Sequence, residues 1–254
     1  MNLTIANIST SVDDPTFAAV VSAISLQVSR DFQPLWNVTA TLTGTRLDLS
    51  GPQVSVDTLT DAILYLGDSC EDPTTGVSHA YGYHFENHNK IPYGFVYLDV
   101  CARSGENWST TLSHEVLELL ADPTAVLTVT GPAPDGGADA APVYYSLEVC
   151  DPTQGDTYTI NDILVSNFVT KSYFGMDGGS SSQSTNFLNL DLEPFSARPR
   201  GYCQYADATG AHQKNGNKVD AERVAARAML AGHRRNARRA DRLTPQSTSS
   251  REAA

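Results

Sequence analysis

Long apolar runs are absent from this sequence of 254 residues. No stretch approaches the roughly 20 consecutive apolar residues that a membrane-spanning helix requires, so we expect no transmembrane segment. The first residues, MNLTIANISTSVDD, also lack the cationic start and the apolar segment of a secretory signal peptide. We therefore expect a protein that stays in the cytoplasm.

Cysteine is scarce, and no two cysteines stand close together. The chain contains only Cys70, Cys101, Cys150 and Cys203. Without a C-x-x-C pair, a structural zinc knuckle or a thioredoxin-like redox site is not expected. Reduced, buried thiols are expected in a protein without a signal peptide. An even number of cysteines also permits two disulfides if the protein is exported by another route, and the sequence leaves both alternatives open.

Basic residues are rare in most of the chain. Residues 1–213 contain 7 Lys and Arg against 25 Asp and Glu, a net charge of −18, whereas residues 214–254 contain 10 against 4, a net charge of +6. Nucleic-acid binding depends on clustered basic side chains, so the acidic body is not expected to bind nucleic acid. The tail, 214–254, is expected to form a basic helix rich in Ala and Arg, followed by disordered residues. It is either simply solvated or contacts an acidic partner, which could be the protein's own body, nucleic acid or anionic lipid.

Hydrophobic periodicity and turn residues predict an α+β fold. Apolar runs predict strands over residues 3–8, 38–47, 59–66, 79–85 and 93–100. Capping residues and prolines predict helices over residues 13–30 and 111–122, the second capped by Ser109 or Thr110 and ended by Pro123. The second half has loop-like composition at 131–142 and 178–186 and strand-like runs at 143–148 and 158–168. This order predicts a mixed sheet with a packed helix and a central helix, followed by an irregular, loop-rich second half.

The second predicted helix contains the sequence HEVLE at 114–118. This H-E-x-x-E motif differs by one letter from the H-E-x-x-H signature of zinc metallopeptidases. His114 and Glu118 lie one helical turn apart, roughly 5 to 6 Å between Cβ atoms, and can bind one cation. Glu115 points about 100° away and can act as the general base for a metal-activated water. The simpler alternative is a surface helix whose His and Glu side chains face solvent.

Several blocks of sequence, in order, resemble an uncharacterised bacterial and phage-associated family with a zincin-like metallopeptidase core. They are RDFQPLWNVTA at 30–40, WSTTLSHEVLELLADP at 108–123, LEVCDP at 147–152, VSNFVTKSYF at 165–174 and PFSARPRGYCQY at 194–205. The resemblance implies that residues 1–213 form a zincin-like, metallopeptidase-type domain with a mixed sheet above the active-site helix. It also implies that 79–85 is an edge strand along which a peptide or protein substrate lies, and that 93–100 is the strand before the helix. Fold analogy does not establish the site, which is argued from its residues.

A zincin-type metal needs a third protein ligand from outside the helix. Asp122 lies two turns from His114, roughly 12 Å along the axis, so we expect it to cap or orient another group. Glu148 and Asp151 come from a separate element, and we expect at least one of them to bind metal. Cys150 lies between them and is either a soft ligand or, as we expect, a buried inert thiol. Strand alternation places Cys150 on the face of Glu148, and Asp151 would point elsewhere if the strand continued through it.

Glu118 stands where the second histidine of the signature would be. One histidine with two carboxylates makes a bound cation a weaker Lewis acid and admits harder ions. We expect zinc, with Mn²⁺ or Ca²⁺ as alternatives. Further groups could stabilise an oxyanion, and no single one is favoured among His79, Tyr81, Tyr83, His84, His88 and Tyr173.

Two functions follow from the predicted site. In the first, the protein is a metal-dependent hydrolase, most simply a peptidase, in which Glu115 is the general base. In the second, it is a non-catalytic zincin-fold binding or structural module that carries a structural ion or no metal. Glu115 discriminates between them, because a purely structural site does not require it.

Overall fold

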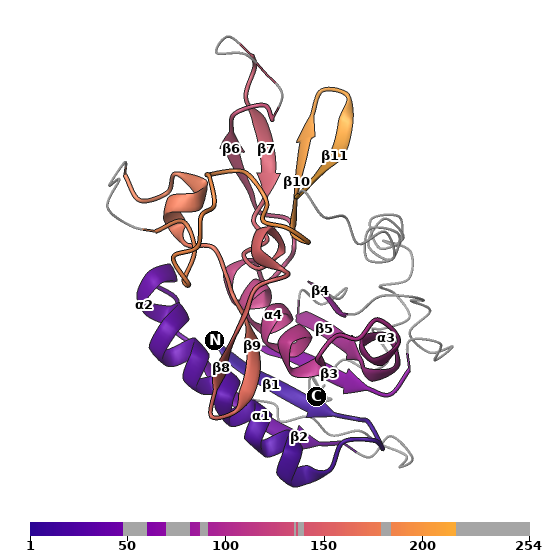
Figure 1. Cartoon of the computed structure of the whole chain (residues 1–254). Helices are drawn as coiled ribbons and strands as arrows, with labels where there is room; N and C mark the ends of the chain where they lie inside the picture. Colours follow the sequence, from indigo (N-terminus) through magenta and orange to yellow (C-terminus); the bar gives the residue numbers. More distant parts are fainter. Residues whose placement is uncertain are drawn as a thin grey trace, which may run out of the picture.

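The structure is a computed structural model that describes residues 1–47, 60–69, 82–86, 91–134, 136, 140–178 and 184–216. Its described residues form a five-stranded sheet, a four-stranded sheet and a two-stranded hairpin. Helices α1 and α4 accompany the five-stranded sheet, and the four-stranded sheet stands apart from it beyond α4 (Figure 1). The predicted α+β class is thus confirmed.

The five-stranded sheet is mixed and has the order β2-β1-β3-β5-β4. Four strands run parallel, β1 (Asn2–Asn7), β2 (Thr41–Arg46), β3 (Ala62–Gly67) and β5 (Pro92–Tyr97). The fifth strand, β4 (Gly82–Glu86), is antiparallel to β5 and lies at the sheet edge. All residues of β3 and β5 are buried, as expected for central parallel strands covered on both faces. The prediction of a mixed sheet with an edge strand near 79–85 is confirmed for the described part, 82–86.

The first helix extends further than its sequence pattern predicted. α1 (Asp14–Leu26) begins where the Asp13 carboxylate accepts a hydrogen bond from the Thr16 amide at 2.8 Å. Beyond it the chain stays helical through a π-helical segment, Gln27–Phe32, and a short α2, Gln33–Trp36. The predicted end near residue 30 is therefore wrong. The buried rings of this extension stack against each other and meet Phe168 and Phe174, so tertiary packing continues the helix.

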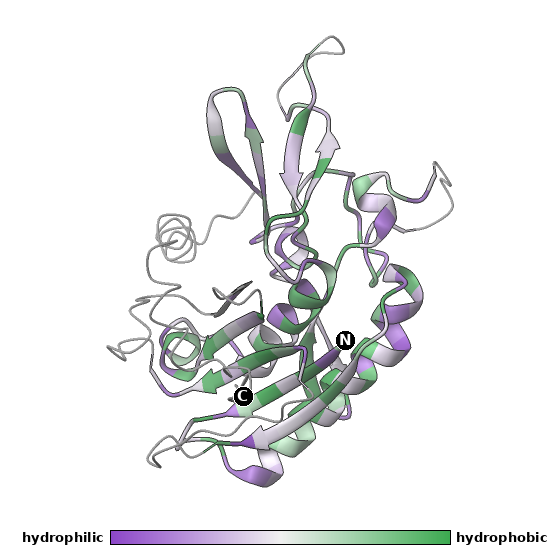
Figure 2. Cartoon of the chain, turned by 180° about the vertical axis from the view of Figure 1, so that it is seen from behind, coloured by the Kyte–Doolittle hydropathy of each residue, from purple (hydrophilic) through white to green (hydrophobic). Residues whose placement is uncertain are grey.

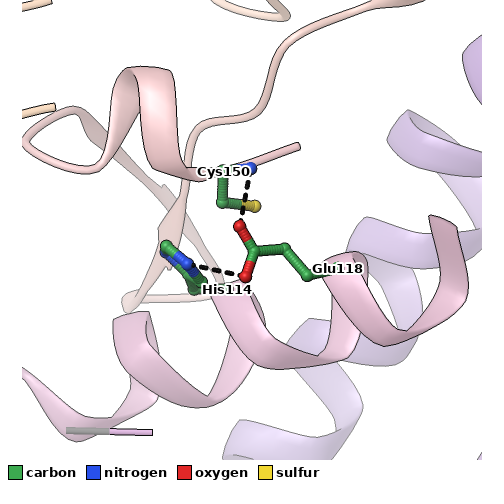
Figure 3. A group of neighbouring side chains, drawn as sticks. All are labelled: His114, Glu118 and Cys150. Carbon is green, nitrogen blue, oxygen red and sulfur yellow. Dashed lines mark hydrogen bonds and ion pairs between the residues drawn. The ribbon is translucent and has the colours of Figure 1, made fainter. Parts of the chain in front are cut away.

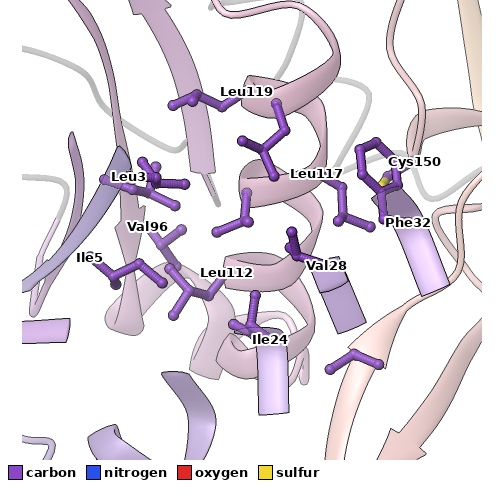
Figure 4. Close-up of a cluster of buried hydrophobic side chains, with 14 of the residues drawn as sticks. Leu3, Ile5, Ile24, Val28, Phe32, Val96, Leu112, Leu117, Leu119 and Cys150 are labelled. Atoms are coloured by element: carbon purple, nitrogen blue, oxygen red, sulfur yellow. The ribbon is translucent and has the colours of Figure 1, made fainter. Parts of the chain in front are cut away.

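The hydrophobic core lies between the sheet and the two helices. Figure 4 shows side chains of α4 meeting Leu3, Ile5 and Val96 of the sheet on one side. On the other side they meet residues of the α1 segment, which is α1 with its helical extension to Trp36. The colouring in Figure 2 shows hydrophobic residues along the strands of the five-stranded sheet. Leu117 of α4 is 0% exposed in this core. The position of α4 is therefore fixed by apolar packing from two directions.

Helix α4 (Trp108–Ala121) carries the H-E-x-x-E motif and begins about one turn before its predicted start. Its N-cap is Asn107, whose side chain accepts a hydrogen bond from the Ser109 amide at 3.0 Å, so the predicted caps at 109 and 110 are wrong. A short helix, α3 (Leu98–Arg103), precedes α4 and shortens the predicted strand 93–100. After α4, the Asp122 carboxylate accepts from the Leu127 amide at 2.6 Å, which fits the predicted capping role.

The second half contains more strands than predicted. β6 (Thr128–Gly131), β7 (Val143–Ser146), β10 (Tyr202–Asp207) and β11 (Gly210–Asn215) form an antiparallel sheet of order β11-β10-β7-β6. Strands β6, β10 and β11 were not predicted, because their short, polar sequences carry little periodicity. β11 ends at Asn215, so the folded domain continues past residue 213, where the change of net charge had suggested that the basic tail begins.

The predicted run at 158–168 is a hairpin of β8 (Thr157–Ile160) and β9 (Ile163–Ser166). Its two-residue turn consists of Asn161 and Asp162, with φ of 48° and 65°. Such left-handed pairs form the type I′ turns that suit β-hairpins. Short 3₁₀ turns at Asp151–Thr153 and Lys171–Phe174 account for part of the predicted irregularity.

Several expectations concern residues outside the described part. Cys101, Cys150 and Cys203 are buried and form no disulfide, as expected, whereas Cys70 is not among the described residues. The basic tail beyond residue 216 also lies outside them. Within the described ranges, no helix is both long and apolar enough to cross a membrane.

Candidate metal centre

The polar face of α4 is buried. The exposed fractions are 4% for His114, 2% for Glu115 and 2% for Glu118. Strands β4, β5 and β9 pack along the helix, and the segment after β7 covers its polar face. The alternative of a surface helix with solvated His and Glu side chains is therefore wrong.

Two carboxylates from different elements converge on one imidazole nitrogen. Nε2 of His114 lies 3.0 Å from Glu118 Oε2 and 3.2 Å from Asp151 Oδ1. This nitrogen can donate at most one proton, so two simple hydrogen bonds from it, one to each carboxylate, are not possible. Two ligands about 2.0–2.2 Å from a tetrahedral zinc ion lie roughly 3.3 Å apart. Each of the two carboxylates is therefore spaced from His114 like one ligand of an ion from another.

The segment 147–153 brings Asp151 to the helix because β7 ends early. The strand stops at Ser146, so the predicted alternation does not extend to Cys150 and Asp151. The Cys150 amide then donates to Glu118 Oε1 at 3.2 Å, and a 3₁₀ turn begins at Asp151. Both residues face α4 as a result, because the strand that would have turned Asp151 elsewhere does not reach it.

A second stretch of chain supports this turn from behind. The Arg198 amide donates to the Pro152 carbonyl oxygen at 2.9 Å. Gly201 lies so close that a Cβ atom there would be 2.3 Å from the same oxygen and 2.9 Å from the Asp151 carbonyl oxygen. Only glycine fits this approach, so the block 194–205 helps to place the Asp151 carboxylate.

Glu148 and Asp151, the two candidates for the third ligand, take different places. Asp151 is 2% exposed and reaches His114, whereas Glu148 is half-buried and its charge acts on His84. The geometry therefore brings together His114, Glu118 and Asp151, with Glu148 on the neighbouring side of the cluster.

The edge strand β4 contributes His84 to the cluster. Its Nε2 lies 3.1 Å from the Asp122 carbonyl oxygen, and its Nδ1 lies 3.5 Å from Glu115 Oε2. Burial acts to lower the pKa of His84, but the carboxylates of Glu115, Glu148 and Glu118 outweigh it and raise the pKa to about 9. The sequence offered His84 as one of several equal candidates, and alternation along a strand was the only signal that could have singled it out.

Cys150 lies beside the converging ligands. Its sulfur, a nitrogen of His114 and a carboxylate oxygen of Glu118 all lie within 4.8 Å of one another (Figure 3). Burial, together with the charge of Glu118, raises the pKa of the Cys150 thiol well above its usual range. In the absence of a metal ion the thiol is thus protonated, and an ion that binds the sulfur has to displace this proton.

The remaining predicted candidates are not brought to this cluster in the described part. Tyr173 is buried, and its hydroxyl donates to the Ser196 carbonyl oxygen at 2.6 Å, so its proton is already engaged. His79, Tyr81 and His88 lie outside the described residues, and only the backbone of Tyr83 is described.

Two serines of α4 attach the helix to the β8–β9 hairpin, Ser113 and Ser109, of which the sequence had suggested only Ser109, and only as a cap. Ser113 Oγ accepts a hydrogen bond from the Ser166 amide at 2.7 Å and donates to the Thr110 carbonyl oxygen. Ser109 Oγ donates to the Leu164 carbonyl oxygen at 2.7 Å. These bonds fix the rotation of α4, and with it the direction in which His114 and Glu118 point.

Comparisons with known proteins add no relative. A scan against protein-family models finds no match, and searches of the curated proteins and of the solved structures find none either. The zincin-like resemblance therefore stays a prediction, and a function has to be argued from the geometry of the site.

Proposed function

We propose that this protein is a metal-dependent hydrolase, a peptidase in its chemistry, with zinc bound by His114, Glu118 and Asp151. The observation that carries the proposal is the approach of two carboxylates to one histidine nitrogen, at 3.0 and 3.2 Å. Histidine nitrogen and carboxylate oxygen both bind zinc, and three protein ligands leave one coordination position open. The same set accepts Mn²⁺ or Ca²⁺, which are therefore tested beside zinc.

The charge of the cluster supports a bound cation. Glu115, Glu118 and Asp151 are each 2% exposed, and no Lys or Arg is buried with them among the described residues, where His84 and His114 are the neighbouring basic groups. Burying an ionised carboxylate costs several kcal/mol unless an opposite charge compensates it. A divalent cation beside a neutral His114 and a protonated His84 would balance the three carboxylates.

Glu115 is the residue that makes the proposed site catalytic. Zinc supplies a Lewis acid that polarises a carbonyl group and acidifies water. Glu115 follows the ligand His114 directly and is buried beside Glu118, so its carboxylate can accept a proton from the attacking water. The two carboxylate ligands weaken the Lewis acid, so slow hydrolysis is expected compared with a site that has two histidines.

The arrangement of strands supports a peptide substrate. β4 is the edge strand next to β5, and the helix with the motif follows β5 in the chain. An extended peptide can pair with an edge strand by backbone hydrogen bonds, as the zincin resemblance implies. His84, which lies on this strand, contacts Glu115 and so connects the proposed peptide edge with the proposed base.

A structural ion is the second candidate, and the low exposure of the cluster favours it. His114, Glu118 and Asp151 are all at most 4% exposed, as in closed structural sites. Such a site would hold the segment 147–153 against α4 without any reaction. The two candidates share their ligands and differ only in the role of Glu115.

The test compares Glu115→Gln with wild type in zinc content and in cleavage of a mixed peptide library. We expect Glu115→Gln to retain one tightly bound zinc ion and to lose cleavage by a factor of about 10² to 10⁴, the usual contribution of a general base. Glu193→Gln, which alters an exposed carboxylate, is the matched control. Unchanged cleavage by Glu115→Gln, or a wild type that binds zinc and cleaves nothing, contradicts the hydrolase and leaves the structural ion.

A further inference from the structure

Glu118 belongs to two groups of metal-ligating side chains. One contains His114 and Cys150, and the other contains His84 and Glu115. In the second group, a nitrogen of His84 and one carboxylate oxygen each of Glu115 and Glu118 all lie within 4.8 Å of one another. Glu118 has one oxygen 3.0 Å from His114 Nε2 and uses the other to accept from the Cys150 amide. The two groups are thus adjacent and share the Glu118 carboxylate.

The hydrogen bonding of His84 fixes which nitrogen faces this second group. The Asp122 carbonyl oxygen, 3.1 Å from Nε2, can only accept, so Nε2 carries the hydrogen. Nδ1 therefore points at Glu115. Histidines that bind metal commonly donate their other N–H to a carboxylate or a backbone carbonyl, which holds the ring in place. His84 already has this arrangement, because its Nε2–H is directed at the Asp122 carbonyl oxygen.

Distance and burial also fit a cation between these groups. Nδ1 of His84 and Oε2 of Glu115 are 3.5 Å apart, long for a hydrogen bond and close to the roughly 3.3 Å between two ligands of one tetrahedral ion. The exposed fractions are 8% for His84 and 2% for both glutamates. Glu148 lies near enough to act on His84 by its charge. Together with Asp151, the cluster offers four carboxylates, which two divalent cations would balance.

We propose that His84, Glu115 and Glu118 form a second divalent-cation site, and that an ion bound there inhibits hydrolysis at the first site. Inhibition, which rests on the proposed function, follows because an ion on the Glu115 carboxylate occupies the oxygen that would accept the proton. The second site is the weaker one, because it shares Glu118 with the first site and its ion is repelled by the charge of the first ion. The protein would thus be active with one zinc ion and switched off by excess zinc.

The binding part is tested with zinc alone on the full chain. Metal-stripped protein is dialysed against increasing free zinc, and bound zinc is measured by mass spectrometry. We expect wild type to bind two ions in separate steps and His84→Asn to bind only the first. His212→Asn, which removes a partly exposed histidine of β11, is the control and should still bind two. A single step in wild type, or a second ion that persists in His84→Asn, overturns the proposal.

If His84→Asn fails to fold, a spectroscopic measurement on wild type tests the second site instead. Two Mn²⁺ ions bridged by the Glu118 carboxylate are magnetically coupled, so the electron paramagnetic resonance spectrum of fully loaded protein should differ from that at one equivalent. Spectra that differ only in intensity contradict the second site.

Inhibition is measured as the ratio of cleavage rates at excess and at stoichiometric zinc within each variant. We expect this ratio to fall at least about tenfold below one for wild type, since the general base contributes at least that much, and to stay near one for His84→Asn. A ratio near one in wild type that holds two ions overturns the inhibitory role. If no variant cleaves any peptide, the proposed function fails, while the stoichiometry still decides the second site.

Discussion

The helical side and the loop side of the candidate metal centre are held in place by different kinds of contact. α4, which carries His114 and Glu118, is packed into the hydrophobic core and meets the sheet and the α1 segment with apolar side chains (Figure 4). The segment 147–153, which carries Asp151, depends on a few backbone hydrogen bonds and on the close approach of Gly201. Changes on the helical side should therefore affect the whole fold, whereas changes on the loop side should affect metal binding first.

The largest effect is expected from Leu117→Ala on the helical side. Leu117 is 0% exposed, and truncating a buried leucine costs about 2–5 kcal/mol of unfolding free energy. Because α4 carries two ligands, zinc affinity should fall together with stability. Urea unfolding followed by circular dichroism checks this, with the 58% exposed Val126 changed to alanine as control. A loss below about 1 kcal/mol would mean that core packing does not hold the helix.

Asp151→Asn separates binding from folding. We expect zinc affinity to fall by at least about 100-fold, equivalent to about 2.7 kcal/mol, because a charged ligand is replaced by a neutral one. The metal-free protein should keep its stability within about 1 kcal/mol, since the change removes a buried charge as well as a partner of His114. Isothermal titration calorimetry with the exposed Asp191→Asn as control measures this. Equal affinities for both variants would exclude Asp151 as a ligand.

Gly201→Ala tests the support of the loop. A Cβ atom 2.3 Å from the Pro152 carbonyl oxygen forces the turn to move, and with it Asp151. We expect zinc affinity to fall about 10- to 100-fold, the effect usually seen when the support of a ligand is lost. Gly67→Ala is the matched control, because its Cβ would meet no atom closer than 3.6 Å. If both variants bind zinc like wild type, the loop is not held in the way described.

The smallest effect is expected from Ser113→Ala, which removes the acceptor of the Ser166 amide. An unsatisfied buried amide costs about 1–3 kcal/mol. Ser29→Ala is the control, because Ser29 also donates to the carbonyl three residues earlier but is exposed. Equal stability of the two variants would show that the bond from α4 to β9 is unimportant.

The helical side was largely predictable from the sequence. The runs at 59–66 and 93–100 are apolar except for Thr60, Asp61 and Asp99, and this pattern is typical of buried parallel strands. The ligand spacing of His114 and Glu118 follows from the helical period alone. The local pattern could not predict that the helical segment continues beyond residue 30 to Trp36, because packing against Phe174 decides it.

On the loop side, the sequence predicted the third ligand only as one of two residues. Both Glu148 and Asp151 were candidates, and the decision depends on the end of β7 at Ser146, which no periodicity marks. The contacts of Gly201 with Pro152 and of His84 with Glu115 join residues far apart in the chain. Such contacts depend on the complete fold, so composition and spacing carried no signal for them.

X-ray absorption at the zinc edge, on protein loaded with one equivalent of zinc, tests the central claim most directly. We predict one imidazole nitrogen and otherwise oxygen ligands at about 2.0–2.2 Å, as His114, Glu118 and Asp151 would provide. Replacing Asp151 by Asn should change the oxygen shell and leave the imidazole signal. A sulfur ligand at about 2.3 Å, which would indicate Cys150, or a spectrum of zinc surrounded only by water would contradict the account.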